Sequence, residues 1–280
     1  MTVELGVFVV PAAEDARVTV DQIVAADQAA LEVVGVQDHP YQRRFLDTWT
    51  LLSYAAAHTE RVRLVPDVAN LPLRPPAVLG KAAASLDVLS GGRVELGLGA
   101  GAFWDAIAAM GGPRRSGPES VDALEDAIAV LRAMWSGDRV VRAGGEHYRV
   151  DGVHPGPAPA HPIGIWLGAY GPRMLRVTGR LADGWLPSVP RLPLEEVMER
   201  HAIIDEAARR AGRDPSEIRR VANANLDGDP AGWADTLARL ATDYRFETLI
   251  VWAEPGDDPV GHVRRVGEEV APRVRELVGA

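Results

Sequence analysis

Short apolar runs alternate with amphipathic stretches along the whole chain. The runs are rich in Val, Ile and Leu, which is typical of buried strands. They span residues 4–10, 33–36, 61–68, 93–96, 163–167, 183–187, 218–224 and 248–252. Between them, apolar residues recur at helical spacing. These predicted helices span 21–31, 47–58, 77–89, most of 103–135, 173–181, 195–211, 233–244 and 260–277.

Eight strand-then-helix units imply parallel strands joined by right-handed crossovers. At a length of 280 residues, with no break in composition, they predict an α/β fold of the (β/α)8 TIM barrel type, as a single domain over 1–280. One segment, from about 136 to 162, interrupts the alternation. It is rich in Gly and Pro and has short extended pieces around Val140 and Tyr148. We interpret it as an excursion between strands 4 and 5, a candidate hairpin and a candidate lid.

Composition narrows the function classes. A hydrophobic content of 47% is ordinary for a globular core, and the absence of cysteine excludes disulfides, zinc-thiolate sites and thiol nucleophiles. A net charge of −9 argues against a general nucleic-acid surface. No apolar run approaches the ~20 residues that span a bilayer, and the N-terminal residues lack a signal-peptide pattern. We therefore expect a cytoplasmic protein with neither nucleic-acid nor membrane partners.

Polar residues and glycines follow several predicted strands at the point where each strand ends. Gln37-Asp38-His39 follows the second strand, Asp67-Val68-Ala69-Asn70 ends the third, and residues 168–172 follow the fifth. In a barrel, the carboxyl ends of the strands meet at one rim, where active sites lie. The sequence therefore predicts a site for a small-molecule substrate at this rim.

The glycine-rich segment after the fourth strand formally fits a dinucleotide fingerprint through Gly97, Gly99 and Ala102. That pattern belongs to the first strand and helix of a Rossmann unit, with an acidic residue about 20 positions further on. Here it falls in the fourth unit, and the acidic residues at that distance, such as Asp122, lie in a helical run. We reject the Rossmann interpretation. Two interpretations remain: bare amides that contact a phosphate, or a tight turn after a strand that ends at residue 96.

His39 with the adjacent Asp38 is the best candidate for proton chemistry, because histidine titrates near neutral pH and a neighbouring carboxylate can orient it. A histidine satisfied by local hydrogen bonds is the equal alternative. His147, His154 and His161 fall in the excursion and are candidates to line a substrate pocket. The histidines show no metal-ligand spacing, so no metal site is predicted.

Four motifs in order resemble the luciferase-like monooxygenase superfamily. They are Gln37-Asp38-His39, the Arg61–Asn70 stretch, Ala77 to Gly101, and Trp166 to Pro187. Within the last, Gly168-Ala169-Tyr170-Gly171-Pro172 followed by Gly179 to Trp185 is similar to the branch that uses the deazaflavin coenzyme F420. The FMN-using branch is similar enough to remain an alternative.

The resemblance implies a barrel that holds the flavin or deazaflavin at its C-terminal rim. It implies that Asp67-Val68 forms a bulge behind the ring, often with a non-proline cis peptide, and that Asn70 reaches the polar edge of the cofactor. His39 would be the proton donor or acceptor, with Asp38 beside it. The implied cofactor contacts are Asp67, Val68, Ala69, Asn70, Gly99, Ala100, Gly101, Gly168, Ala169, Tyr170, Gly171 and Pro172.

One departure matters. Dehydrogenase-like members carry an acidic residue directly after the second loop glycine, where this chain has Ala102, so a second acid must come from elsewhere. Arg43, Arg44 and Arg74 are candidates to meet an acidic substrate or the glutamate tail of F420, and solvated surface arginines are the equal alternative.

We therefore expect an F420-dependent oxidoreductase that moves a hydride to or from a small organic substrate, and the family often forms homodimers. The alternative is an FMN-dependent monooxygenase supplied by a flavin reductase partner. A non-catalytic flavin-binding protein is a further alternative. A phosphate-binding isomerase or aldolase ranks low, because Lys81, the sole lysine, lies within a predicted helix.

Overall fold

A computed structural model describes residues 3–226, 232–252 and 258–279. The main sheet is parallel, in the order β3-β2-β1-β11-β10-β9-β8-β5-β4. Its strands are β1 (Glu4–Val9), β2 (Val33–Val36), β3 (Arg63–Pro66), β4 (Ala69–Asn70), β5 (Leu96–Gly99), β8 (Ile165–Leu167), β9 (Gly184–Trp185), β10 (Arg219–Asn225) and β11 (Thr248–Trp252). The short strands β3 and β4 are two pieces of one strand, interrupted at Asp67 and Val68.

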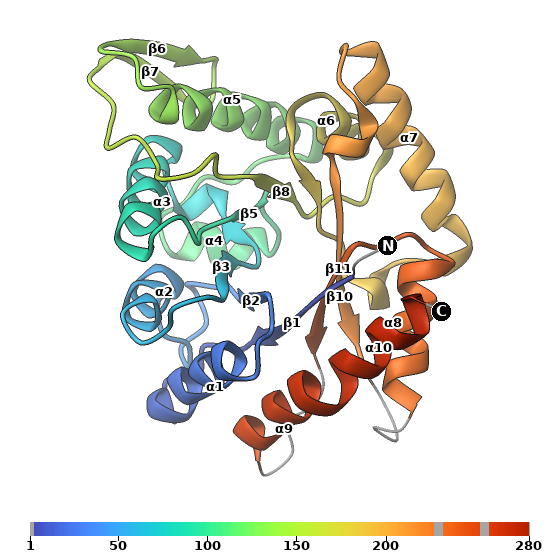
Figure 1. Ribbon diagram of the computed structural model, residues 1–280. Helices are drawn as coiled ribbons and strands as arrows, with labels where there is room; N and C mark the ends of the chain where they lie inside the picture. The colour runs from blue at the N-terminus through green and yellow to red at the C-terminus, as the bar shows by residue number, and fades with distance from the viewer. Residues whose placement is uncertain (1–2, 227–231, 253–257, 280) are drawn as a thin grey trace.

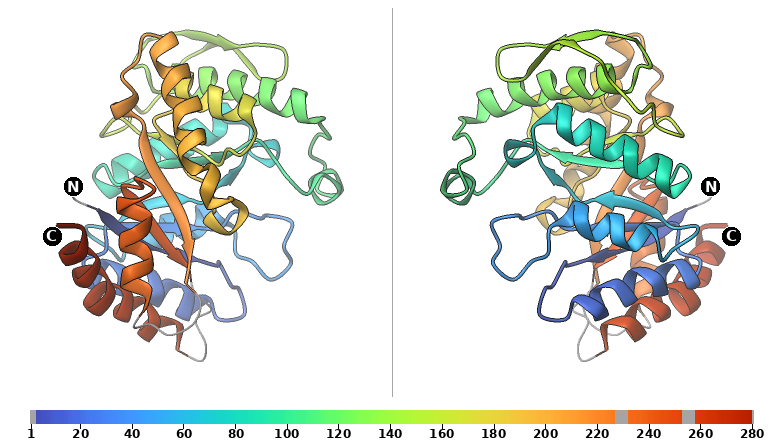
Figure 2. Two further views of the ribbon diagram at one scale, coloured as in Figure 1. Left: turned by 90° about the vertical axis from the view of Figure 1, so that its right-hand side faces the viewer. Right: turned by 90° about the vertical axis from the view of Figure 1, so that its left-hand side faces the viewer.

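The two ends of this strand order meet. β4 pairs with β5, and a bridge between Leu64 and Val94 joins β3 to the residues just before β5. The eight strand positions therefore form the predicted (β/α)8 barrel, with its helices on the outside (Figures 1 and 2). They are α1 (Ala16–Gln28), α2 (Thr48–Ala56), α3 (Pro76–Ser90), α4 (Trp104–Ala109), α5 (Gly117–Trp135), α6 (Pro172–Leu181), α7 (Val197–Arg210), α8 (Trp233–Thr242), α9 (Pro259–Arg265) and α10 (Ala271–Gly279).

Apolar side chains fill both faces of the sheet. The large cluster lies between the strands and the surrounding helices. A second cluster joins Val33, Val65, Trp166, Val221 and Ile250, with Leu186 next to β9. These residues come from strands all around the barrel. Their side chains can meet only in the barrel interior. The barrel is thus a packed core that supports a site at its rim. No helix within the described ranges is long and apolar enough to cross a membrane.

The fourth strand differs from its prediction. β5 begins at Leu96 and includes Gly97 and Gly99, whereas the sequence predicted a strand over 93–96 and a loop from Gly97. Tertiary contact explains the difference. A Cβ at Gly97 would lie 2.2 Å from the carbonyl oxygen of Pro66, and one at Gly99 would lie 2.8 Å from Val68 Cγ2. These glycines therefore allow the third and fourth strands of the barrel to approach closely. The sequence interpretations, a phosphate-contacting loop or a tight turn, included no such contact.

The excursion contains the expected hairpin. Strands β6 (Val141–Gly144) and β7 (Arg149–Val153) pair antiparallel and lie over α5 at the outer edge of the molecule (Figures 1 and 2). Val141 and Val150 pack against Val130 and Met134 of α5. The hairpin is therefore anchored to a helix by its own small apolar cluster.

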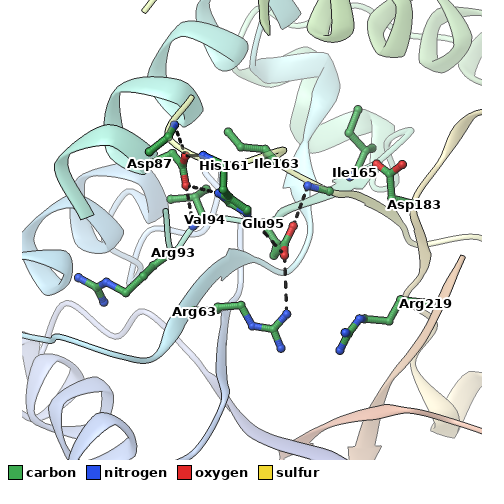
Figure 3. A network of polar contacts seen from close by, with 12 residues as sticks. Arg63, Asp87, Arg93, Val94, Glu95, His161, Ile163, Ile165, Asp183 and Arg219 are labelled. Carbon is green, nitrogen blue, oxygen red and sulfur yellow. Dashed lines mark hydrogen bonds and ion pairs between the residues drawn. The ribbon is translucent and has the colours of Figure 1, made fainter. Parts of the chain in front are cut away.

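A polar network anchors the other end of the excursion at the amino-terminal side of the barrel (Figure 3). The fully buried Asp87 carboxylate accepts from the backbone N–H of Ala160 (2.8 Å) and of His161 (3.0 Å), and contacts the His161 ring at Nδ1 (2.8 Å). Nearby, Glu95 accepts from the Gly164 N–H at 2.7 Å and lies 3.7 Å from Arg63. Burial raises the pKa of Glu95. His161 is thus a structural residue and not part of a substrate pocket.

Candidate active site

A cavity of about 980 Å³ opens at the carboxyl ends of the strands, where the sequence predicted the site. The strand ends each contribute wall residues. Among the described residues these include Phe8, Gln37, Asp38, His39, Tyr41, Asp67, Val68, Ala69, Asn70, Gly99, Ala100, Gly101, Ala102, Phe103, Gly168, Tyr170, Gly171, Pro172, Leu186, Ser188, Arg191, Asn223, Asn225 and Trp252. The structure thus brings together His39, Asp38 and eleven of the twelve expected contact residues.

Ala169 is the exception. It is fully buried and does not line the cavity. Its carbonyl oxygen accepts from the indole N–H of Trp185 at 2.9 Å, which fixes the turn after β8 from behind. Ala169 therefore supports the loop that presents Gly168 and Tyr170, and its contact with a cofactor stays a prediction.

The interruption of the third strand forms one wall of the cavity. The peptide bond between Asp67 and Val68 is cis, as the resemblance implied. Val68 and Ala69 both face the cavity, and Gly97 and Gly99 leave the space behind them that Val68 occupies. The result is an apolar wall on which a flat ring can lie.

Unpartnered oxygen atoms gather in this cavity. Seven buried side-chain N or O atoms among the described residues lack a hydrogen-bond partner, and three of them belong to cavity residues: Asp67 Oδ2, Asn70 Oδ1 and Asn223 Oδ1. Buried acceptors are normally satisfied, so a group of them at one site calls for an explanation. A ligand that presents N–H groups would satisfy the amide oxygens of Asn70 and Asn223.

Asp67 is a buried carboxyl group without a nearby cation. Its Oδ1 accepts from Asn223 Nδ2 at 3.0 Å, and it takes part in no ion pair among the described residues. A Cβ at Gly35 would lie 2.7 Å from Oδ2, so the glycine on β2 makes room for the carboxyl group. Burial raises the pKa of Asp67 to about 7, and the Asn223 amide opposes the shift only in part. Asp67 therefore changes charge near neutral pH.

Asp38 does not hydrogen-bond to His39, although the sequence placed it there to orient the ring. Its carboxylate, 1% exposed, accepts from Arg74 Nε at 2.6 Å and Nη2 at 2.7 Å and from the Asn70 N–H at 2.9 Å. Arg74 also contacts Asp47 at 2.7 Å. This bidentate ion pair ties the loop after β2 to the segment that follows β4. Arg74 is therefore mostly buried and paired, and neither expectation for it is correct.

Tyr41 takes the position beside His39. Its hydroxyl hydrogen-bonds to His39 Nδ1, and the rings of His39, Tyr41 and Phe103 meet at centroid distances of 5.3 to 6.1 Å. Burial lowers the pKa of His39, the Asp38 charge opposes this, and the Arg191 cation adds to it. Burial, followed by the Asp38 charge, raises the pKa of Tyr41 to about 12. The pair is thus neutral near pH 7.

A neutral His39–Tyr41 pair can work in both directions. With Nδ1–H donating to the tyrosine oxygen, Nε2 has a free lone pair and can accept a proton. With the tyrosine O–H donating to Nδ1, Nε2 carries the proton and can donate it. The pair therefore suits a reaction in which a substrate hydroxyl group loses a proton or a carbonyl group gains one.

The excursion does not line the cavity in this structure. None of the residues 136–162 lines the cavity, since the hairpin packs on α5 outside the barrel. The mouth is bordered instead by Phe103, which is 55% exposed, and by Arg191. Phe103 directly precedes α4 with φ at 55°, a left-handed conformation that turns the chain at the rim.

Sequence reasoning missed Tyr41, Phe103, Arg191 and Asn223. Asn223 carried a signal: it sits two residues after Val221 on the seventh strand, at an inward position near the carboxyl end. Tyr41 lies two residues from His39, but only the loop conformation brings the hydroxyl group to the ring. Phe103 and Arg191 follow their strands at longer distances, and no pattern distinguishes them.

Comparison with known proteins identifies the class that this barrel and cavity define. The luciferase-like monooxygenase family matches residues 2–227. The match covers most of the chain, and the protein therefore belongs to that family.

Individual relatives point to one branch. The chain is 31% identical over 229 residues to an F420-dependent glucose-6-phosphate dehydrogenase of Intrasporangium calvum, covering 76% of this chain and 67% of that one. It is 32% identical over 256 residues to an F420-dependent hydroxymycolic acid dehydrogenase of Mycobacterium tuberculosis, covering 86% and 67%.

Solved structures agree on the fold. An F420-dependent secondary alcohol dehydrogenase, solved with an F420-acetone adduct, superposes with a TM-score of 0.85 at 18% identity and covers 98% of this chain and 99% of that one. A riboflavin lyase solved with modified FMN superposes with a TM-score of 0.82 at 15% identity, covering 99% and 92%. At these identities the likeness concerns the barrel alone.

Proposed function

We propose that this protein is an F420-dependent oxidoreductase that transfers a hydride between the deazaflavin and a small alcohol or carbonyl compound. The observation that carries the proposal is the His39–Tyr41 pair at the mouth of a cavity backed by the Asp67–Val68 bulge. The named activities of the curated relatives support the choice of F420.

The residues present fit such a cofactor. The apolar surface of Val68 and Ala69 suits one face of a flat ring, and the unpartnered oxygens of Asn70 and Asn223 suit a ring edge that carries N–H groups. The bare backbone at Gly99 to Gly101 and at Gly168 to Pro172 leaves room for the ribityl and phosphate portion. When bound, the cofactor supplies the two-electron chemistry.

The residues of this chain would orient the substrate and manage its proton. In the oxidation of an alcohol, His39 would accept the hydroxyl proton at Nε2, and the bound cofactor would serve as the two-electron acceptor. Tyr41 keeps the His39 ring in place. Dehydrogenase-like members of the family carry an acidic residue where this chain has Ala102. The missing carboxyl group argues against oxidation of a sugar phosphate.

Cofactor titration tests the proposal. Adding F420 or FMN to the purified protein and following fluorescence is expected to give saturable binding of F420. Tight binding of FMN with no response to F420 would instead establish the FMN alternative, in which reduced flavin comes from a reductase partner. Unchanged turnover in a His39→Ala variant would remove the proton role of His39.

We also propose that the protein forms a homodimer through the outer face of α2 and α3. Tyr54 on α2 and Val78 and Leu89 on α3 are 57%, 68% and 82% exposed, and these helices lie side by side (Figure 2, right). Exposed apolar side chains on two neighbouring helices suit a self-complementary contact. Leu89→Glu is expected to reduce the sedimentation coefficient to that of a monomer. Met198→Glu, at an exposed methionine on α7, is the matched control and should leave it unchanged.

A further inference from the structure

The carboxyl group of Asp67 is a titratable group that the proposed hydride transfer does not use. It lies inside the barrel, directly under the cavity, between Gly35 of β2 and Asn223 of β10. The residue is 7% exposed, and its Oδ2 atom is buried without a partner. No arginine or lysine pairs with it in the described part of the chain.

The hydrogen bonds around Asp67 are those expected of a carboxylic acid rather than a carboxylate. Asn223 Nδ2 donates to Oδ1 at 3.0 Å, while Asp67 Oδ2 and Asn223 Oδ1 are both left as acceptors without a donor. One proton on Oδ2 reduces the excess of acceptors, because the acid then becomes a donor. A buried carboxylate in the same place would keep an unpaired charge, which is far more costly.

We propose that the side chain of Asp67 is neutral and protonated when the cofactor is bound, so that cofactor affinity depends on pH. This inference rests on the proposed function and extends it, since the resemblance implied a cofactor contact for Asp67 but no role for the charge of its side chain. It also supplies an acid to a site where Ala102 replaces the expected one.

The charged residues near Asp67 do not stabilise its carboxylate form. Among the described residues, Tyr170 in the turn after β8 feels the Asp67 charge: burial is the main cause of its raised pKa, and the Asp67 charge adds to the rise. Asp38 at the end of β2 is neutralised by Arg74, and Arg191 faces Tyr170 and His39. Asn223 from β10 is uncharged. A cofactor that displaces water from the cavity therefore makes ionisation of Asp67 harder.

The sign of the pH effect follows from linkage. The pKa of Asp67 in the free protein is about 7, and bound cofactor raises it further. Between these two values, each pH unit weakens binding about tenfold, because the free protein must take up a proton to bind. Below the lower value the affinity is independent of this group.

The experiment measures the dissociation constant of F420, by fluorescence, from about pH 6 to about pH 8.5. Three proteins are compared: the wild type, Asp67→Asn, and Glu95→Gln. Asparagine has the shape of the neutral acid but cannot ionise, so its affinity is expected to lack the tenfold loss per pH unit. Glu95, whose pKa burial also raises, directly precedes β5 and so lies at the amino-terminal end of the barrel, and Glu95→Gln should follow the wild type. F420 itself ionises in the same way with all three proteins, so its own titration does not affect the comparison between them.

Infrared spectroscopy of the cofactor-free protein provides a readout that needs neither ligand nor turnover. A carboxylic-acid C=O band that titrates near pH 7 and is missing in Asp67→Asn is expected. The inference would be overturned if the affinity of the wild type and of Asp67→Asn changed with pH in parallel. It would also be overturned if the wild type showed no acid band that titrates near neutral pH. In both cases the proposal of F420 binding would stand. Absence of binding at every pH would overturn the proposed function and, with it, the coupling.

Discussion

Replacing Arg74 with methionine tests how the loop that carries His39 is held. Methionine keeps much of the apolar stem but removes the guanidinium group. The Asp38 carboxylate, 1% exposed, then retains only the Asn70 N–H out of its three hydrogen bonds. Removing one partner of a buried ion pair costs about 3–5 kcal/mol, because the remaining charge stays buried. The contact of Arg74 with the half-exposed Asp47 adds at most about 1 kcal/mol.

We expect Arg74→Met to lower the free energy of unfolding by about 3–5 kcal/mol. Urea denaturation followed by tryptophan fluorescence measures it. The double variant Asp38→Asn/Arg74→Met is the decisive comparison, since it removes the stranded charge and should be more stable than Arg74→Met alone. A single variant within about 1 kcal/mol of wild type, or a double variant no more stable than the single one, would refute the reasoning.

Three further predictions concern the site and its support. Tyr41→Phe should leave the fold unchanged but lower kcat more than it raises KM, because the His39 ring loses its Nδ1 partner; equal turnover by the two proteins would contradict this. The pKa of His39 is lowered by burial, so the neutral base persists below its usual value, and the acidic limb of the kcat/KM profile should fall below pH 6.5, measured with the identified substrate. Gly97→Ala should lower the free energy of unfolding by about 1–3 kcal/mol in a denaturation experiment, because the new Cβ would lie 2.2 Å from the Pro66 carbonyl oxygen. Gly232→Ala is the control: there is open space around Gly232, so this variant should match the wild type.

The linkage also predicts the sign of a stability effect at Asp67. Its pKa is about 7 in the folded protein, against 3.8 for an aspartate in the unfolded chain, so the folded state holds the proton to higher pH. Stability is therefore lost as pH rises from about 4 to about 7, and Asp67→Asn should not show this loss. Unfolding midpoints at the two pH values, compared with those of the wild type, measure the difference. An equal pH dependence in both proteins would contradict the assignment.

The barrel and the position of its site follow from local patterns. Apolar runs and helical spacing identify all eight strand-helix units, since a strand buried on both faces must be apolar and a covering helix must be amphipathic. Strand ends share one rim in any such barrel, so the order of the elements is enough to place His39, Asn70 and Gly168 together.

The exact strand boundaries and the polar partners in the site depend on tertiary contacts. The start of β5 depends on how close Gly97 comes to Pro66, and the partner of Asp38 is Arg74, thirty-six residues away in the chain. The proton on Asp67 depends on burial and on the absence of a nearby cation, and neither property can be read from neighbouring residues. Local sequence therefore determined which elements form and which residues reach the rim. Only folding determined which polar groups meet there, because pairing and desolvation arise between strands that are distant in the chain.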